Sequence, residues 1–137
     1  EFIEEGEEFG HFLGMYENIY NESANEHIGL TIVMTGDADI VNPVITRLES
    51  NEYIQIGEDG HQFTLSVGET LIITTGTGNK HVYWVHDGQK EEINYYMTDG
   101  SSFIQLMRGD NNISFNAEEG KYSMTLNITY RLQYARA

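Results

Sequence analysis

The sequence predicts an all-β protein made of short antiparallel strands, arranged as a sandwich or a barrel. Residues 62–131 form a series of β-type runs separated by turn residues, apolar residues alternate with period two from residue 28 onward, and no capped amphipathic helix pattern occurs. Regular strand–turn spacing of this kind is typical of all-β folds. The strands expected in this half cover residues 62–67, 70–75, 81–86, 92–96, 102–106, 112–115 and 122–131.

Turn residues lie between these runs. Gly, Asn and Asp tolerate positive φ or bond to their own backbone, as a reversing chain requires. The Asp87-Gly88 pair is expected to close a hairpin. The remaining expected turns are Val67-Gly68-Glu69, Gly76-Thr77-Gly78-Asn79, Asp99-Gly100, Arg108-Gly109-Asp110 and Glu118-Glu119-Gly120.

The strand pattern begins before this series. Over residues 28–35 large apolar side chains alternate with smaller or polar ones, which gives a strand with one apolar face. A further strand is expected over 40–47, with Pro43 inside it. Proline donates no ladder hydrogen bond, so this strand is placed at a sheet edge or at a strand start. A strand over 53–56 and a hairpin loop over 57–60 follow.

Residues 1–27 differ from the rest in being crowded with Glu and Asn. Phe9, Phe12 and Tyr16 fit a helical stripe, but three glycines interrupt it, and each costs about 1 kcal/mol inside a helix. We therefore expect an entry strand and a loop here, belonging to the sandwich or its linker. Residues 28–137 are expected to form the β-sandwich domain itself, and 137 residues in total are the size of one domain.

Charge and composition exclude several classes of partner. The net charge is −15, and residues 1–60 hold 14 acids and one base, Arg47. Nucleic acid and anionic lipid bind through Lys and Arg, so neither is an expected partner. No apolar run approaches the ~18 residues of a membrane helix, so no membrane insertion is expected. Cysteine is absent, which removes disulfides and thiolate chemistry.

No motif of catalysis or metal binding is present. The five histidines form no HxH or HExxH pattern, and neither a Gly-x-Ser-x-Gly elbow nor a phosphate-binding glycine loop occurs. Asp37 and Asp39 lie in Gly-Asp-Ala-Asp, but an EF-hand would need a Glu where Leu48 stands, so a simple β-turn is expected. We predict that the protein is not an enzyme and has no cofactor and no metal site.

The aromatic residues Tyr83, Trp84, Tyr95 and Tyr96 are the candidate ligand-binding residues. They fall on neighbouring expected strands, and aromatic rings can stack on sugars. Adjacent strand residues point to opposite faces, so one residue of each pair is expected in the core. His81 and His86, five residues apart on one strand, are likewise expected on opposite faces.

The order of the motifs resembles the C-terminal domain of the siphophage distal tail protein family, also called phage tail component or tail hub proteins. Arg108 stands where the family often has a proline before the Gly-Asp-Asn turn, and proline there would only pre-set the turn. The resemblance implies a galectin-like β-sandwich, a two-sheet antiparallel jelly roll, over residues 28–137. The motifs that carry it are Asn42-Pro43-Val44-Ile45, Val67-Gly68-Glu69-Thr70-Leu71, Asp87-Gly88, Phe103-Ile104-Gln105-Leu106, Gly109-Asp110-Asn111-Asn112 and a long final strand over 124–134.

The resemblance also implies a role. It predicts a virion structural protein at the tail tip of a phage or prophage, made in the bacterial cytoplasm. Implied partners are a receptor-binding protein, the tail tube and a tail-associated fibre or lysin, in a homo-hexameric ring formed by a separate belt domain. The chain begins at Glu1 without Met and lacks that belt, so we expect a monomeric piece of a longer protein. The alternative is a carbohydrate-binding module for host-surface glycans.

Overall fold

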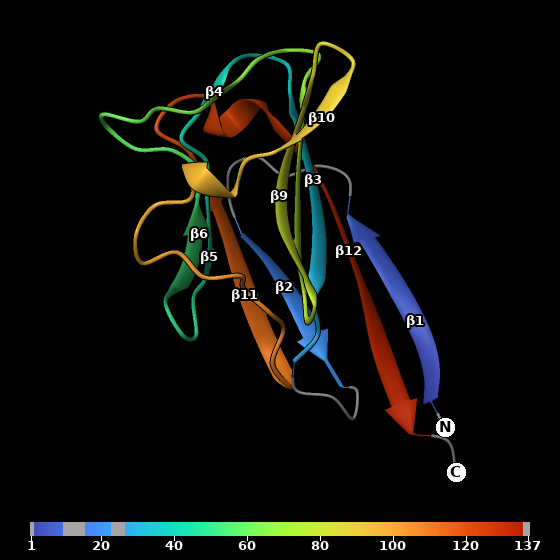
Figure 1. Ribbon diagram of the computed structural model, residues 1–137. Helices are drawn as coiled ribbons and strands as arrows, with labels where there is room; N and C mark the ends of the chain where they lie inside the picture. Colours follow the sequence, from blue (N-terminus) through green and yellow to red (C-terminus); the bar gives the residue numbers. More distant parts are fainter. Residues whose placement is uncertain (1, 10–15, 23–26, 136–137) are drawn as a thin grey trace.

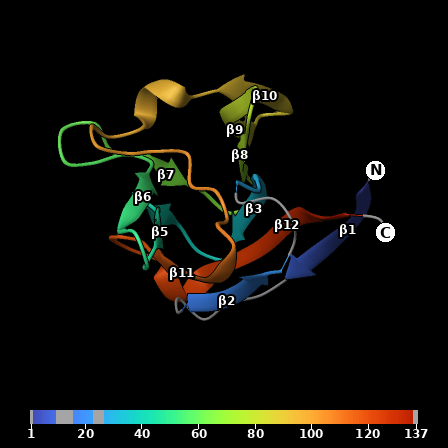
Figure 2. The same cartoon turned by 90° about the horizontal axis from the view of Figure 1, so that it is seen from below.

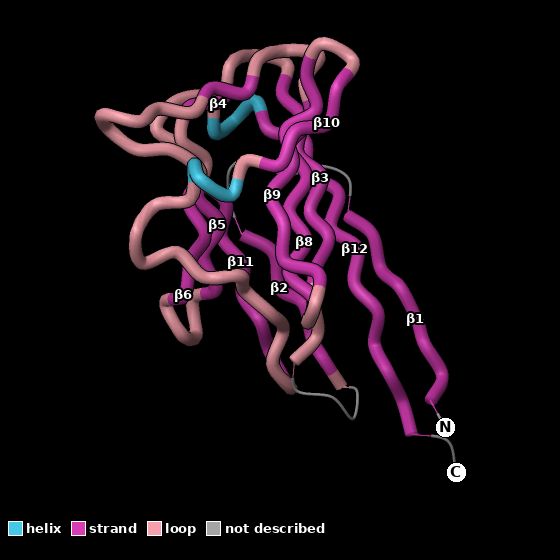
Figure 3. Tube along the Cα trace, viewed as in Figure 1, coloured by secondary structure: helices cyan, strands magenta, loops and turns pink. Residues whose placement is uncertain are grey.

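The computed structural model describes residues 2–9, 16–22 and 27–135. Strands dominate, with two short 3-10 helices, η1 and η2 (Figures 1 and 3). The elements are β1 Phe2–Phe9, β2 Tyr16–Asn21, β3 Leu30–Gly36, β4 Ile40–Val41, β5 Val44–Arg47, β6 Glu52–Gln55, β7 Thr64–Leu65, β8 Thr70–Gly76, β9 Asn79–His86, β10 Gln89–Glu92, η1 Asn94–Tyr96, β11 Gly109–Asn116, η2 Lys121–Ser123 and β12 Met124–Ala135.

Two antiparallel sheets pack face to face. The larger has the order β1-β12-β3-β8-β9-β10, and the smaller has the order β2-β11-β5-β6. A two-stranded piece, β4-β7, accompanies them. In Figures 1 and 2, β5 and β6 lie across the core from β8, β9 and β10. The prediction of an all-β, two-sheet antiparallel sandwich is therefore confirmed.

Alternating side chains build the core between the sheets. In β3, Leu30, Ile32 and Met34 are buried while the residues between them are partly exposed. The register places Ile32 opposite both Ile73 of β8 and Ile128 of β12, so buried side chains form rows across the sheet. Full burial of one such side chain stabilises the fold by about 1.5–3 kcal/mol. The apolar residues that alternate in the sequence thus form the face of the sheet that packs in the core.

The first 27 residues contribute two strands, where the sequence predicted one entry strand and a loop. β1 pairs with β12 at the edge of the larger sheet, with Phe2 opposite Ala135 and Phe9 opposite Ile128. β2 pairs with β11 at the edge of the smaller sheet. The helical stripe of Phe9, Phe12 and Tyr16 falls mostly on 10–15, outside the described residues.

The strand expected over 40–47 is divided in two. Asn42 has φ 49°, and Pro43 follows it between β4 and β5. The Asn42 side chain holds this break, because its Oδ1 accepts the Phe63 N–H at 3.0 Å and its Nδ2 donates to Glu118 at 2.7 Å. A left-handed residue followed by proline cannot continue a ladder, so the prediction of one strand was wrong.

Two further expected strands are absent. Residues 102–106 form only a bridge, in which Ile28 and Leu106 exchange backbone hydrogen bonds of 2.9 and 2.8 Å. The segment before it covers the free edge of β6 instead, with the Thr98 N–H donating to Gln55 and the Ser102 N–H donating to Tyr53. Residues 92–96 become the end of β10 and η1. The run expected over 62–67 is a strand only at Thr64–Leu65.

Asn111 explains the Gly-Asp-Asn-Asn sequence at the start of β11. The Asn111 side chain is fully buried, and its Nδ2 donates to the carbonyls of Ile19, Met107 and Gly109 at 3.2, 2.8 and 3.0 Å. Its Oδ1 accepts hydrogen bonds from the Met107 N–H and from Nε of buried Arg47, both at 2.8 Å. One amide therefore joins β2, β5 and the chain entering β11.

Candidate functional site

Aromatic and acidic side chains gather where the β9–β10 hairpin meets the turn before β8 and the helix η1. We call this group the hairpin cluster; it consists of His61, Phe63, Glu69, Trp84, His86, Asp87, Glu91, Tyr95 and Tyr96. Strand geometry explains part of the grouping, since Trp84 lies opposite Leu71 of β8 and opposite Glu91 of β10. Residues two apart share a face, so His86 lies on the same side of the sheet as Trp84.

Trp84 lies at the centre of the hairpin cluster. Its ring packs edge-on against Phe63, with centroids 5.4 Å apart and planes at 80°, and Phe63 packs in turn against Tyr96 at 5.3 Å and 64°. Phe63 is fully buried, and Trp84 and Tyr96 pack on the core from its margin. Edge-to-face pairs of this kind add about 0.5–1.5 kcal/mol beyond area burial. The expectation that one residue of the 83–84 pair contributes to the core is met by Trp84.

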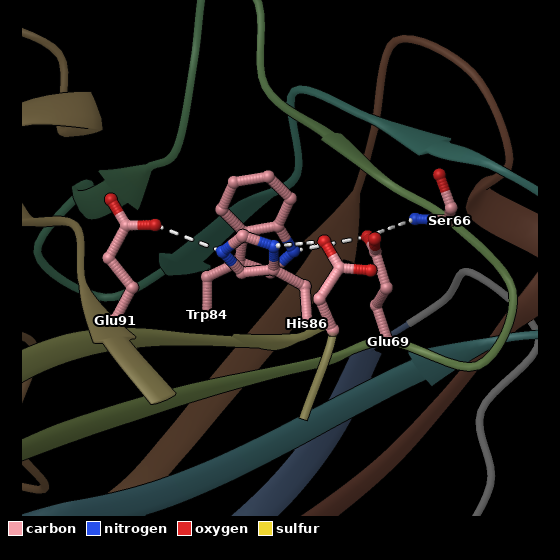
Figure 4. A network of polar contacts seen from close by, with 6 residues as sticks. Ser66, Glu69, Trp84, His86 and Glu91 are labelled. Atoms are coloured by element: carbon pink, nitrogen blue, oxygen red, sulfur yellow. Dashed lines mark hydrogen bonds and ion pairs between the residues drawn. The ribbon is translucent and has the colours of Figure 1, made fainter. Parts of the chain in front are cut away.

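Glu69 fixes the orientation of the indole. The Trp84 Nε1–H donates to Glu69 Oε1 at 3.0 Å, and the same oxygen accepts the Ser66 N–H at 2.9 Å (Figure 4). The turn between Ser66 and Glu69 contains Gly68 with φ 89°, a conformation that L side chains rarely adopt. The expected Val67-Gly68-Glu69 turn thus positions the carboxylate that accepts the hydrogen bond from Trp84.

His86 covers Trp84 and faces two carboxylates. The two rings are stacked, with centroids 3.7 Å apart and planes at 17°. His86 Nε2 lies 2.9 Å from Glu91 Oε1, and Nδ1 lies 3.4 Å from Asp87 Oδ2 (Figure 4). The hydrogen bond with Glu91 raises the pKa of His86 above 6.5, aided by Asp87 and opposed by burial. The same contact, with a further one from Tyr95, lowers the pKa of Glu91.

Tyr95 and Tyr96 lie in the single turn of η1, so the prediction that they alternate on a strand was wrong. The Asn94 side chain accepts the Val82 N–H at 2.8 Å, which takes the place of the next ladder bond. The chain then tightens, with the Tyr96 N–H donating to the Ile93 carbonyl at 2.9 Å. Both tyrosines consequently project together instead of to opposite faces, with ring centroids 5.0 Å apart.

Tyr95 is the exposed member of the hairpin cluster. Its side chain is 58% exposed, and its hydroxyl donates to Glu91 Oε2 at 2.7 Å, a bond that raises the pKa of Tyr95. The exposed His61 ring stacks on Tyr96 with centroids 4.4 Å apart and planes at 17°, and Tyr95 lies 6.2 Å from it. Tyr95 and His61 therefore form the part of the cluster that solvent reaches.

Tyr83 lies apart from the other three candidates. It occupies the outer face of the larger sheet, where it stacks on His81 at 5.2 Å and lies under the Lys90 ammonium at 4.2 Å. His81 pairs there with Glu92. The opposite placement of His81 and His86 is as predicted, and the structure brings Trp84, Tyr95 and Tyr96 together without Tyr83.

Sequence reasoning did not identify the remaining members of the cluster. Phe63 and His61 come from a segment more than twenty residues before Trp84, and no sequence pattern predicts that they contact it. The alternation rule did contain a signal for His86 and Glu91, because a two-residue Asp87-Gly88 turn fixes which residues of the two strands pair. The observed register, His86 opposite Gln89 and Trp84 opposite Glu91, is the one such a turn dictates.

The chemistry of the cluster is that of packing and charge pairing. Among the residues that the structure describes, no three His, Asp or Glu side chains come together to hold a metal ion. Among the described carboxyls, Glu49 and Glu91 have lowered pKa values and so stay ionised at neutral pH. A carboxyl that acts as a general acid requires the opposite shift; in the cluster, a raised pKa is found at His86, which the two neighbouring carboxylates hold.

No protein-family profile, no curated protein and no solved structure matches this chain. None of the helices within residues 2–9, 16–22 and 27–135 is long and apolar enough to cross a membrane.

Proposed function

We propose that this chain is a non-catalytic structural domain, the peripheral domain of a distal tail hub protein from a phage or prophage. In this role it serves as an attachment platform for receptor-binding or baseplate proteins. The observation that carries the structural role is the engagement of Trp84. Its ring contacts Phe63 and His86 and its N–H is bonded to Glu69, so the protein itself occupies the groups that a sugar platform would offer to a ligand.

The fold supports the tail-protein assignment. The β-sandwich is the architecture that the motif resemblance implies, and the motifs occupy structural positions in it. Gly68 and Gly88 have positive φ in tight turns, and the Gly-Asp-Asn-Asn segment supplies the buried Asn111 junction. A net charge of −15 also fits a partner that is protein rather than nucleic acid.

The proposed role places the domain in a larger assembly at the tail tip. The full-length protein forms a homo-hexameric ring through a belt domain, and this sandwich projects from the ring at the virion tail tip. Candidate neighbours are the receptor-binding protein, the tail tube and a tail-associated fibre or lysin. The protein is made in the bacterial cytoplasm before assembly.

Immunogold electron microscopy tests the location. Antibodies against this domain, applied to tailed particles produced by the phage or lysogen that encodes the chain, should place gold at the tail tip. Antibody preadsorbed with the pure domain is the control and should leave particles unlabelled. Gold on the capsid, or particles that carry none of the protein, would overturn the proposal.

Carbohydrate binding is the second candidate, and Tyr95 is the observation in its favour. The ring is 58% exposed, and the bond from its hydroxyl to Glu91 holds it in place. A glycan array probed with the domain and with Tyr95→Ala separates the two functions. Binding that disappears in Tyr95→Ala while the melting temperature is unchanged would favour the glycan role, and an array without any signal favours the structural one.

A further inference from the structure

Both ring nitrogens of His86 face carboxylate oxygens. Nε2 lies 2.9 Å from Glu91 Oε1 and Nδ1 lies 3.4 Å from Asp87 Oδ2. A neutral imidazole has one N–H and one lone pair, so one carboxylate would then face a lone pair. An imidazolium donates from both nitrogens, so this geometry favours the protonated ring, chiefly through Glu91, because the Asp87 side chain is 95% exposed.

The stack on Trp84 points to the same protonation state. The His86 ring lies parallel to the indole with centroids 3.7 Å apart, and tryptophan is the aromatic side chain that attracts a cation most strongly. Only 22% of the His86 side chain is exposed. The charged ring therefore lies between the face of the indole and two carboxylates. The His86 ring covers one face of Trp84.

Glu91 connects this charge to the exposed edge of the hairpin cluster. One oxygen of Glu91 meets His86, and the other accepts the Tyr95 hydroxyl at 2.7 Å. The neighbouring turn before β8 presents one more acid, Glu69, which holds the Trp84 N–H. The charged or titratable groups around His86 are thus Asp87 from its own turn, Glu91 from β10, Glu69 from the β8 side and, through Glu91, Tyr95 from η1.

We propose that the β9–β10 hairpin is a pH-responsive cover for the Trp84 corner of the core. With His86 protonated, Asp87 and Glu91 are bound and the imidazolium covers the indole. Loss of the proton leaves one carboxylate without its donor and removes the attraction to the ring, so His86 leaves Trp84 and the corner opens to solvent.

The direction of the effect follows from linkage. The pKa of His86 in the folded protein lies above its ordinary value of 6.5, mainly because of the hydrogen bond with Glu91. The stabilisation is therefore complete below 6.5 and is lost as the pH rises through the raised value. The cover is therefore closed in acid and opens as the pH rises through the raised pKa of His86.

Trp84 is the only tryptophan, so its fluorescence reports on this corner alone. Acrylamide quenching of Trp84, followed from about pH 5 to about pH 9 across the histidine titration range, should show a rise in the quenching constant with a midpoint above the ordinary histidine value. A quenching constant that does not change with pH would overturn the proposal.

Three variants test whether the pH-dependent change in Trp84 quenching arises from His86. Glu91→Gln removes the principal acceptor and should shift the midpoint down toward 6.5, while His86→Gln should abolish the step. His81→Gln is the matched control, because His81 lies on the same strand and pairs with Glu92 on the opposite face. It should leave the midpoint unchanged. If His86→Gln does not fold, Glu91→Gln still decides, since an unchanged midpoint there contradicts the mechanism.

Discussion

Gly29 and Gly76 touch backbone to backbone. A Cβ on Gly29 would collide with the Cα of Gly76 and lie 2.7 Å from its nitrogen. This close approach accompanies a buried hydrogen bond next to it, in which the Leu30 N–H donates to the Thr75 hydroxyl at 2.7 Å. The start of β3 and the end of β8 therefore approach each other more closely than any side chain would permit.

We expect Gly29→Ala to destabilise the fold by about 1–3 kcal/mol, the usual cost of overpacking. Gly76→Ala is a matched control, because a Cβ at Gly76 meets no atom within 4 Å and its φ is not positive. Urea unfolding of both variants measures the difference. Equal midpoints for the two variants would contradict the close approach.

Trp84→Ala should destabilise the domain by about 3 kcal/mol, the lower end of the range for truncating a large aromatic side chain. The lower end applies because Trp84 packs at the margin of the core, against Phe63 and under His86. Tyr122→Ala, at a side chain 66% exposed, serves as the control and should change stability by less than about 0.5 kcal/mol. Thermal melts that coincide for wild type and Trp84→Ala would refute the structural role of the ring.

Asn111→Asp should destabilise the fold by at least about 2 kcal/mol, since it removes two buried N–H donors and each buried hydrogen bond left unmade costs about 1–3 kcal/mol. The substitution replaces Nδ2, which donates to three backbone carbonyls, with a carboxylate oxygen, which cannot donate to them. Asn116→Asp is the control: it is exposed, and its Oδ1 only accepts, from the Ala117 N–H at 2.9 Å. Denaturant unfolding should separate the two variants, and the loss in Asn111→Asp should lessen at low pH as the new acid is protonated.

Glu49 should make stability depend on pH in the acid range. Burial pushes its pKa upward, but the backbone and side-chain hydrogen bonds from Asn112, with the charge of Arg47, outweigh this and lower the pKa below 4.5. A lowered pKa gives stabilisation that is complete above 4.5 and lost as pH falls through the lower folded-state value. Glu49→Gln should therefore be less stable than wild type at pH 7 and should approach it in acid.

The control for this titration is Glu58→Gln, an exposed acid in the 57–60 loop. Replacing this exposed side chain should change the stability at pH 7 by less than about 0.5 kcal/mol. A Glu49→Gln variant whose difference from wild type does not change with pH would mean that Asn112 does not hold the carboxylate.

The isolated domain should be a monomer or a weak dimer at micromolar concentration. A net charge of −15 opposes self-association at low salt, and the segment covering β6 removes one edge at which strands could join. Multi-angle light scattering measures the mass directly. A stable hexamer of this chain alone would contradict the proposal that the ring is formed by another domain.

The fold class could be predicted because the strongest strands are locally consistent. Leu30, Ile32 and Met34 alternate, and turns that contain Gly or Asp follow β3, β8 and β9. In two of the misassigned segments a side chain takes the place of a ladder bond. Asn42 with Pro43 divides one expected strand, and Asn94 ends another by accepting the Val82 N–H.

The candidate site was only partly predictable. Alternation correctly separated Tyr83 from Trp84 and His81 from His86. It could not bring Phe63 or His61 to Trp84, because that contact depends on how distant loops cross the end of the sandwich. Tyr95 and Tyr96 were misplaced because a β-type composition does not distinguish a strand from one tight helical turn when an asparagine side chain makes the decisive bond.

The β1–β12 ladder has a mechanical consequence. Phe2 lies opposite Ala135 at one end of this antiparallel pair, and Phe9 lies opposite Ile128 at the other. Tension that draws Phe2 and Ala135 apart acts on the first rung alone and opens the ladder rung by rung, as a zipper opens, instead of shearing all its hydrogen bonds at once. Residues 128–130 of β12 pair with β3 as well as with β1, so β3 begins to bear load once the opening reaches Glu7 and Tyr130.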